Sequence, residues 1–321
     1  MAPMTRFRSP GGVPTPDVAS YYRRRVEGGV GLIITEGILP DLPSAGRETT
    51  IPRLTAGAAE TGWRRVTDEV HAAGGRIAAQ LWHQGSQHGG GAQAWTPSGL
   101  DGTHAMSGRD FERLLRAYAD AARTAVRAGF DAVEIHAAHG YLLDEFLWPV
   151  SNRRADRYGG SPYNRAAFPA EVIRAVRDAI PAGMPLIVRF SQFKERDHAA
   201  RIAESPAELG IILERFVAAG ATVLHASQRR FWDAAFPGAD LNLAGWAKRL
   251  TGLPTITVGS IGLTRNLDRL DELMARQAGG EFDLIALGRV LLGNPSWARL
   301  VAGGRTHEIR DYRKSDEDTY F

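Results

Sequence analysis

The sequence contains no cysteine among its 321 residues. This excludes a disulfide framework, a thiolate zinc or iron–sulfur site, and a cysteine nucleophile. Excess charge of one sign is also scarce, because 39 lysine and arginine residues against 36 aspartate and glutamate residues leave a formal net charge of +3. An electrostatic nucleic-acid binder needs a far larger positive excess, so we expect no nucleic-acid partner.

Long apolar runs are absent as well. No run approaches the roughly 20 residues that a membrane helix requires, and the segment from Met1 to Arg8 lacks the apolar stretch of a signal peptide. We therefore expect a cytoplasmic protein with no membrane contact. With 44% hydrophobic and 23% charged residues, the composition is that of a chain able to bury a large core.

Short apolar runs rich in β-branched residues alternate along the chain with helical patterns. Eight such runs are candidate strands, at residues 1–4, 31–35, 76–80, 131–135, 185–189, 221–225, 254–258 and 283–287. Helical spacing is clearest over 111–126, behind a Ser107 N-cap, and over 207–219, behind Ser205-Pro206. Strict alternation of β and α segments favours parallel pairing with right-handed crossovers.

Eight strand–helix units are the number that closes a barrel. We predict an α/β fold, a single-domain (β/α)8 TIM barrel over residues 1–304, followed by a charged C-terminal tail over residues 305–321. The tail is interpreted as surface or subunit-contact material, which allows a homo-oligomer. The alternative is an open doubly wound sheet, but no strand is followed by a GxGxxG helix start. Long stretches at 82–106 and 136–163 predict that the active site is built from loops there.

Two glycine-containing turns follow the last two candidate strands, at Gly259-Ser260 and Gly288-Arg289. Glycine lets a phosphate approach backbone N–H groups, a following helix N-terminus adds partial positive charge, and Arg289 can add a bidentate contact. We favour a phosphate site. The alternative is that these glycines only make tight turns.

His136 and His139 leave a predicted strand directly into a loop that also carries Tyr141. The two imidazoles could donate hydrogen bonds to a substrate oxygen, with Tyr141 as proton donor, or could simply bind loop backbone. They could also form a metal pair completed by His83 or His225, as in a metal-dependent TIM-barrel hydrolase. The missing strand-end aspartate and the missing His-x-His spacing weaken that alternative, and we predict no metal ligands.

Arg189 ends an apolar predicted strand, and a buried guanidinium requires an anionic or strongly accepting partner. Gln80 ends another strand and offers one donor pair and one acceptor, the complement of a lactam or pyrimidine edge. Together these side chains suggest a flat heteroaromatic ligand.

Several sequence blocks together resemble the old yellow enzyme family of flavin-dependent ene-reductases. The blocks are MAPMTR at 1–6, TEG at 35–37, QLWH at 80–83, HAAHGYLL at 136–143, SNRRADRYGGS at 151–161, GR at 288–289 and NP at 294–295. They follow one another in order over nearly the whole chain. We assign the block at 151–161 to loop structure, in which Arg154, Asp156 and Arg165 form a salt-bridge network.

The resemblance implies FMN held non-covalently at the barrel mouth, NAD(P)H as hydride donor, and small activated alkenes as substrates. Hydride would pass from FMN to the β-carbon of an α,β-unsaturated carbonyl or nitro compound. The residues implied to line the isoalloxazine ring are Pro3, Met4, Thr5, Gly37 and Gln80. Arg189 is implied to lie at the pyrimidine end of the ring. Those implied to hold the phosphate are Gly259, Ser260, Gly288 and Arg289. Those implied to be catalytic are His136 and His139, binding the substrate carbonyl oxygen, and Tyr141, donating the proton.

Three features depart from the family pattern. The chain opens inside the first strand, where the family has further residues before it, so the natural protein could begin earlier. Ser86 stands where many relatives carry arginine. The segment from His225 to Trp232 is unusually basic and aromatic, and it either forms one wall of the substrate pocket or packs its own loop.

Overall fold

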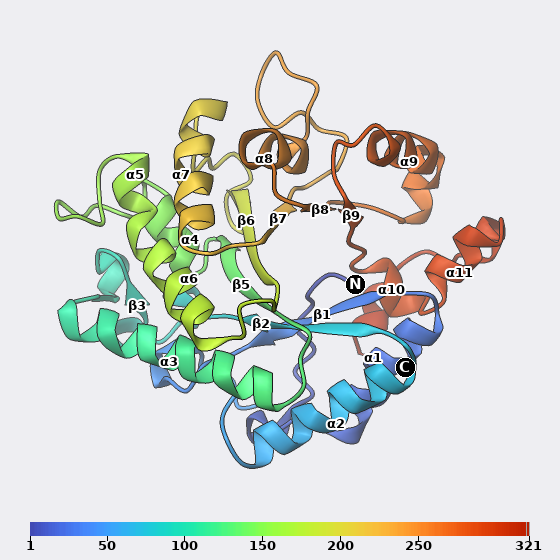
Figure 1. The fold of residues 1–321 in the computed structure, drawn as a ribbon, viewed down its shortest axis with the longest axis horizontal. Coiled ribbons are helices and arrows are strands. Elements are labelled where there is room, and N and C mark those ends of the chain that lie inside the picture. The colour runs from blue at the N-terminus through green and yellow to red at the C-terminus, as the bar shows by residue number, and fades with distance from the viewer. Residues whose placement is uncertain (319, 321) are drawn as a thin grey trace.

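The computed structural model describes residues 1–318 and 320, and it consists of a curved parallel sheet surrounded by helices (Figure 1). Seven strands pair in the order β1-β2-β5-β6-β7-β8-β9, every pair parallel. They are β1 (Leu32–Ile38), β2 (Arg76–Leu81), β5 (Ala132–His139), β6 (Leu186–Lys194), β7 (Val223–Ser227), β8 (Thr255–Val258) and β9 (Leu284–Ile285). Two shorter strands, β3 (Trp95–Thr96) and β4 (His104–Ala105), pair separately. The seven later predicted strands are thus confirmed, and the architecture is that of a TIM barrel.

The predicted first strand, residues 1–4, does not form a regular strand. Its backbone nevertheless joins the two edges of the sheet. The Met1 amino group donates to Leu32 O (2.6 Å), and Met1 O accepts from the Ile34 N–H (3.1 Å). On the other side the Ala2 N–H donates to Leu287 O, beyond β9 (2.7 Å). Pro3 has no N–H to continue a ladder, so the pairing stops after two residues.

Helices cover the outside of the sheet (Figure 1). They are α1 (Pro16–Glu27), α2 (Ala58–Ala72), α3 (Gly108–Arg127), α4 (Leu142–Leu147), α5 (Pro162–Arg165), α6 (Ala167–Ala179), α7 (Pro206–Ala218), α8 (Leu243–Thr251), α9 (Leu270–Ala278), α10 (Val290–Gly293) and α11 (Trp297–Ala302). The two predicted helices are confirmed as α3 and α7. Ser107 and Asp110 form a capping box at the start of α3, and Ser205 Oγ accepts from the Glu208 N–H at the start of α7 (3.3 Å).

Buried apolar side chains form two layers. The larger one fills the space between the strands and the helices. The smaller one lies inside the barrel and takes residues from successive strands: Ala2, Ile34, Ala78, Ala132, Ile187, Ile256 and Ala286. Only alanine and isoleucine occur in this buried layer, and their limited size lets the strands of the barrel approach one another. The packed interior leaves the carboxyl ends of the strands as the place for a site.

The described part of the charged tail, residues 305–318 and 320, lies against the barrel. Arg310 bridges to Asp316 (Nη2–Oδ1, 2.7 Å), and Asn294 Nδ2 donates to Arg310 O (2.9 Å). Tyr320 stacks on Tyr21 of α1, with ring centroids 4.5 Å apart, so the C-terminus lies beside α1 (Figure 1). The tail's predicted part in subunit contact stays a prediction.

The loop at 151–161 is fixed differently from the predicted network. Arg154 Nε donates to Asp156 Oδ1 (3.0 Å), as expected. Arg165 instead donates to backbone carbonyls, at Leu147 (2.7 Å), Gly160 (2.6 Å) and Ile202 (3.1 Å). Among the described helices, none is both long enough and apolar enough to pass through a bilayer.

Candidate active site

Two neighbouring cavities open at the carboxyl ends of the strands. The first, which we call the reaction cavity, measures about 630 Å³ and is lined by Pro3, Met4, Thr5, Phe7, Gly37, Gln80, Trp82, His136, His139, Tyr141, Arg189, Glu195, Lys314 and Glu317. The second, the phosphate cavity, measures about 450 Å³ and includes Pro3, Met4, Arg189, Gln228, Arg229, Arg230, Gly259, Ser260, Gly288 and Arg289 in its lining. Pro3, Met4 and Arg189 border both. The structure thus brings all thirteen sequence-predicted site residues to one continuous region.

The two histidines lie within β5, which is longer than predicted and runs to His139. Residues three apart on a regular strand face opposite sides of the sheet. Here the pairing of β5 with β6 shifts between Ala137 and His139, and His139 has a left-handed backbone (φ +67°). This bulge turns the second histidine to the same side as the first, with ring centroids 5.2 Å apart.

Both imidazoles are neutral near pH 7. Burial lowers the pKa of His136 and of His139 well below 6.5, and the nearby Arg189 charge lowers both further. Ser227 Oγ lies 2.8 Å from His139 Nε2 and accepts from Arg189 Nη2 (3.3 Å). The network is satisfied when Ser227 donates its O–H to Nε2, which leaves the His139 proton on Nδ1. His136 Nδ1 is buried without a hydrogen-bond partner in the described part of the chain.

Tyr141 stands beside the pair, at the N-cap of α4, with its ring 5.0 Å from that of His136. The turn that carries it is held by a buried ion pair. Asp144 Oδ2 accepts from the Gly140 N–H (2.6 Å) and from Lys194 Nζ (2.7 Å). Burial raises the Tyr141 pKa above its usual value of 10, and the Glu195 carboxylate raises it further. The phenol therefore keeps its proton at neutral pH.

Next to the histidines, the reaction cavity is lined by a cation without an ion-pair partner in the described part of the chain and by an oriented amide. Arg189 is 7% exposed and forms no ion pair within residues 1–318 and 320, and its buried Nε has no partner there. Gln80 Nε2 donates to Glu134 Oε1 (2.7 Å), while Glu134 Oε2 lies 2.6 Å from His225 Nδ1. A carboxylate only accepts, so it fixes the direction of the amide and leaves Gln80 Oε1 as a free acceptor.

The phosphate cavity is built mainly from the turns after β8 and β9. Ser260 has a left-handed backbone (φ +50°), and its Oγ donates to Arg229 O (2.8 Å). A Cβ added at Gly288 would meet only Met4 Sδ, at 3.9 Å. The chain's own packing therefore does not require glycine at 288. The open space there is instead what a ligand lying close to the backbone needs.

These features fit a flat, phosphate-bearing cofactor such as FMN. The unpaired Arg189 Nε and the free Gln80 Oε1 are a donor and an acceptor for the edge of a heteroaromatic ring. The space at Gly288, with Arg289 on the cavity wall, accommodates a phosphate. Gly37 lines the reaction cavity, and the packing of the chain itself also requires glycine there, because a Cβ would lie 2.5 Å from the Trp82 ring.

The histidines required by the hydrolase alternative have other partners. His83 Nδ1 accepts from the Gly85 N–H (3.1 Å), and its Nε2 lies 3.2 Å from Ser44 Oγ. His225 is bound to Glu134. Within the described residues, no three histidine or carboxylate side chains come together as a metal site.

Several residues at the site were not identified from the sequence: Phe7, Trp82, Glu195, Lys314 and Glu317 line the reaction cavity, Phe193 lines the phosphate cavity, and Ser227 contacts His139. Ser227 lies two residues after His225, on the same face of β7, so strand periodicity was a usable signal for it. Glu195 and Phe193 depend on β6 continuing to Lys194, past its predicted end at Arg189. Nothing in the local pattern marks that extension.

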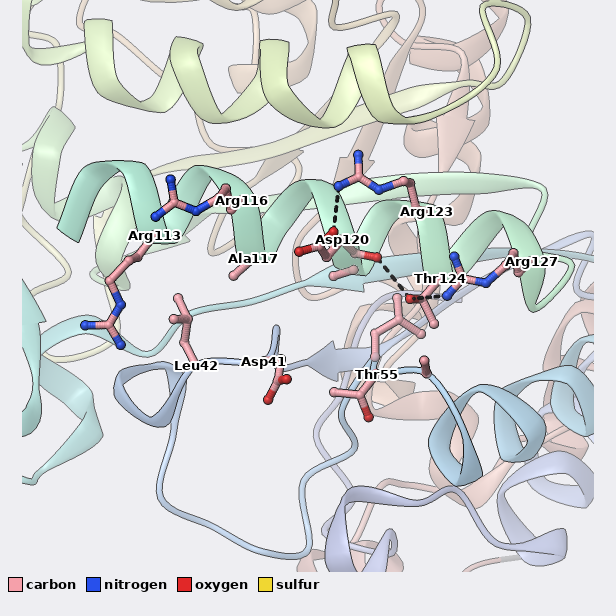
Figure 2. A pocket seen from close by; sticks show the side chains of 13 residues that line it. Asp41, Leu42, Thr55, Arg113, Arg116, Ala117, Asp120, Arg123, Thr124 and Arg127 are labelled. Atoms are coloured by element: carbon pink, nitrogen blue, oxygen red, sulfur yellow. Dashed lines mark hydrogen bonds and ion pairs between the residues drawn. The ribbon is translucent and has the colours of Figure 1, made fainter. Parts of the chain in front are cut away.

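A third cavity, of about 530 Å³, lies along α3 and away from these residues (Figure 2). Its arginines largely pair with neighbours on their own helix or on α2. Arg123 donates to Asp120 (2.5 Å), and Arg127 Nη2 bridges to Glu60 Oε2 (2.9 Å). No strand-end side chain of the reaction cavity borders it, so we place the chemistry at the barrel mouth.

The fold and the two cavities define a class: a TIM-barrel enzyme that binds a planar cofactor with a phosphate. The model of the NADH:flavin oxidoreductase / NADH oxidase family matches residues 1–308. The chain belongs to this family, and it is an FMN-dependent NAD(P)H:flavin oxidoreductase.

Individual relatives and a solved structure support this family membership. The chain is 32% identical to an NADH oxidase of Thermoanaerobacter brockii, covering 97% of this chain and 49% of that protein, so it spans about half of that relative's length. It is 33% identical to 12-oxophytodienoate reductase 7 of Oryza sativa subsp. japonica, covering 94% of this chain and 84% of that protein. The solved structure of an old yellow enzyme homologue from Zymomonas mobilis matches with a TM-score of 0.83 at 27% identity, covering 99% of this chain and 91% of that one.

Proposed function

We propose that this protein is an ene-reductase acting on small α,β-unsaturated carbonyl or nitro compounds. The observation that carries the proposal is the convergence of two neutral imidazoles and a protonated phenol on one side of a single cavity. A hydrolase would need a nucleophile or a metal-bound water there. Two neutral donors and one weak acid instead match the reduction of a polarised double bond.

When bound, FMN accepts hydride from NAD(P)H and passes it to the β-carbon of the alkene. His136 and His139 each donate an N–H to the substrate carbonyl oxygen, where negative charge grows as the β-carbon is reduced. Donors that are already fixed stabilise that charge without reorganisation, as in an oxyanion hole. Tyr141 then gives its proton to the α-carbon, which completes the saturated product.

The cofactor-binding roles follow from the unpaired groups. Arg189 would hold the pyrimidine end of the flavin with its guanidinium, and its positive charge would favour the uptake of electrons there. Gln80 Oε1 would accept a hydrogen bond from a ring N–H, and Pro3, Met4, Thr5 and Gly37 would line the ring. The backbone of Gly259, Ser260 and Gly288 would hold the phosphate, with Arg289 as its counter-charge.

The purified holoenzyme tests this proposal under anaerobic conditions. We expect a yellow protein that NADPH or NADH bleaches and that 2-cyclohexenone restores, with cyclohexanone as the product. Bleaching without recovery by any enone or nitroalkene would leave an NAD(P)H oxidase and remove the ene-reductase assignment. We further propose that the protein works in the cytoplasm, where nicotinamide nucleotides are available.

A further inference from the structure

A small cleft adjoins the phosphate cavity at Phe193, Gln228 and Arg229. This side cleft measures about 150 Å³, and its lining includes Gln192, Phe193, His198, Arg201, Arg229 and Asp233. Arg229 borders the phosphate cavity as well, so it stands between the two. Arg229 belongs to the basic segment from His225 to Trp232, to which the proposed function gives no role.

Positive charge in the side cleft is incompletely neutralised. Within residues 1–318 and 320, neither Arg201 nor Arg229 forms an ion pair. Arg229 Nη1 donates to His198 Nδ1 (2.8 Å), and Arg201 makes one long contact, to Ala200 O (3.4 Å). The carboxylate in the lining, Asp233, lies 3.9 Å from Arg230, where both side chains are exposed. Two guanidinium groups thus line the same cleft, and neither has a carboxylate partner in the described part of the chain.

The side cleft is separated from the reacting groups by one aromatic ring. The Phe193 ring lies 5.1 Å from His139 on one side and 6.1 Å from His198 on the other. The arginines of the side cleft are therefore one aromatic ring away from His139, within the reach of a ligand that reacts there and extends beyond the reaction cavity. An alkene of cyclohexenone size ends before this point, whereas a nicotinamide dinucleotide does not.

We propose that Arg201 and Arg229 bind a phosphate group of the nicotinamide dinucleotide that reduces the flavin. This inference rests on the proposed function. The guanidinium fork suits phosphate oxygens, and it can take either the pyrophosphate common to both dinucleotides or the additional 2′-phosphate of NADPH. The segment from His225 to Trp232 then contributes Arg229 to the binding of the hydride donor.

The test compares the holoenzyme with an Arg201→Gln/Arg229→Gln double variant. Anaerobic stopped-flow reduction by NADPH and by NADH gives the Kd of each nucleotide and the limiting rate of flavin reduction. We expect the Kd to rise at least about tenfold for one or both nucleotides, with the limiting rate unchanged, because a charge-assisted contact is lost far from the reacting ring. Arg116→Gln, on the exposed face of α3, is the matched control and should leave both values at parental levels.

Comparison of NADPH with NADH shows which phosphate group of the dinucleotide the two arginines bind. A rise in Kd for NADPH alone supports the proposal and assigns the 2′-phosphate, and equal rises support it and assign the pyrophosphate. Unchanged Kd values for both overturn it. Release of FMN from the double variant also overturns it, because the arginines would then belong to the cofactor phosphate.

Calorimetric titration of the oxidised holoenzyme with NADP⁺ and NAD⁺ gives a readout independent of turnover. The double variant should bind at least one of them about tenfold more weakly than the parent. If the parent flavin is reduced by neither NADPH nor NADH, the proposed function fails, and this titration still decides whether the arginines bind a nucleotide phosphate.

Discussion

The reaction cavity and the phosphate cavity use different parts of the chain. The reaction cavity takes buried side chains from strands and strand ends, with His136, His139 and Arg189 each less than 10% exposed. The phosphate cavity takes backbone from turns and arginines that reach solvent. The difference indicates that the chemistry depends on donors held in fixed directions, whereas cofactor retention depends on charge and close backbone approach.

Among the substitutions considered, removal of the proton donor in the reaction cavity should have the largest effect on rate. Tyr141→Phe keeps the ring and its packing against Trp82, but deletes the proton that completes alkene reduction. We expect the reoxidation of reduced flavin by cyclohexenone to slow by about 10² to 10⁴, with near-parental flavin reduction by NAD(P)H. Nitroalkenes, which hold the charge without protonation, should be affected less. Equal slowing of both half-reactions in stopped-flow would show that Tyr141 positions ligands instead.

A substitution in the phosphate cavity should instead weaken FMN binding and leave the chemical step intact. Arg289→Ala removes a charge-assisted contact of about 1.5 to 3 kcal/mol, so the Kd for FMN should rise tenfold or more. When FMN is saturating, turnover with cyclohexenone should remain near parental. A fluorescence titration measures the affinity, and an unchanged value would place the phosphate elsewhere.

A ligand that does not react distinguishes the role of the histidine pair in substrate binding from any role in FMN binding. A phenolate over oxidised flavin resembles the enolate oxygen, and its charge-transfer band reports its binding. His139→Ala should weaken phenol binding by about tenfold, as expected for one hydrogen bond to a charged oxygen, and should leave FMN bound. Parental phenol affinity in the variant would contradict the proposed role of the pair.

Acid sensitivity should also originate in the buried histidines of the barrel mouth. Burial lowers the folded-state pKa of His83 to about 3, and lowers those of His136, His139 and His225. Below pH 6.5 the unfolded chain takes up protons that these folded histidines do not. The contribution of each such histidine to the free energy of unfolding should therefore decrease as pH falls below 6.5, by up to about 1.4 kcal/mol per pH unit. The buried carboxyl groups of Glu36 and Glu145, whose pKa values burial raises to about 7 and about 8, act in the opposite direction.

Urea unfolding at pH 7.5 and 5.5 measures this dependence. His83→Gln should reduce the pH dependence, because one such histidine is removed. His307→Gln, at a side chain that is 78% exposed, should leave it unchanged. If the free energy of unfolding changes equally between pH 7.5 and 5.5 in the parent and in His83→Gln, His83 does not contribute to the pH dependence.

The smallest expected effect concerns the tautomer of His139. Ser227→Ala removes the hydroxyl group beside Nε2, so the proton is no longer directed to Nδ1. We expect phenol binding to weaken about two- to tenfold, less than in His139→Ala, since a neutral hydrogen bond contributes about 0.5 to 1.5 kcal/mol. A loss as large as that of His139→Ala would show that Ser227 itself contacts the ligand.

The sequence predicted the barrel well, because seven strand cores are continuous apolar runs and the two clearest helices have ordinary capping residues. It also predicted which residue types gather at the strand ends. The continuation of β5 to His139 and of β6 to Lys194 was missed, since polar residues there resemble a loop. Their burial depends on neighbouring strands, which a local pattern does not contain.

Partners distant in sequence were likewise not predictable. Glu134 directs the Gln80 amide across 54 residues, and His139 meets Ser227 across 88. Residues 1–4 were predicted as a strand that closes the barrel. In the structure, only Met1 and Ala2 form backbone hydrogen bonds to the two edges of the sheet. Proline removes the donor that would extend them.

The bulge in β5 restricts which amino acids position 139 accepts. A left-handed backbone at a non-glycine residue carries a cost, and histidine, asparagine and aspartate adopt it more readily than other side chains. Of these three, only histidine and asparagine also offer a neutral N–H to a carbonyl oxygen. The backbone and the chemistry therefore restrict this position to the same two residues, and a library of variants at 139 should retain enone binding only with them.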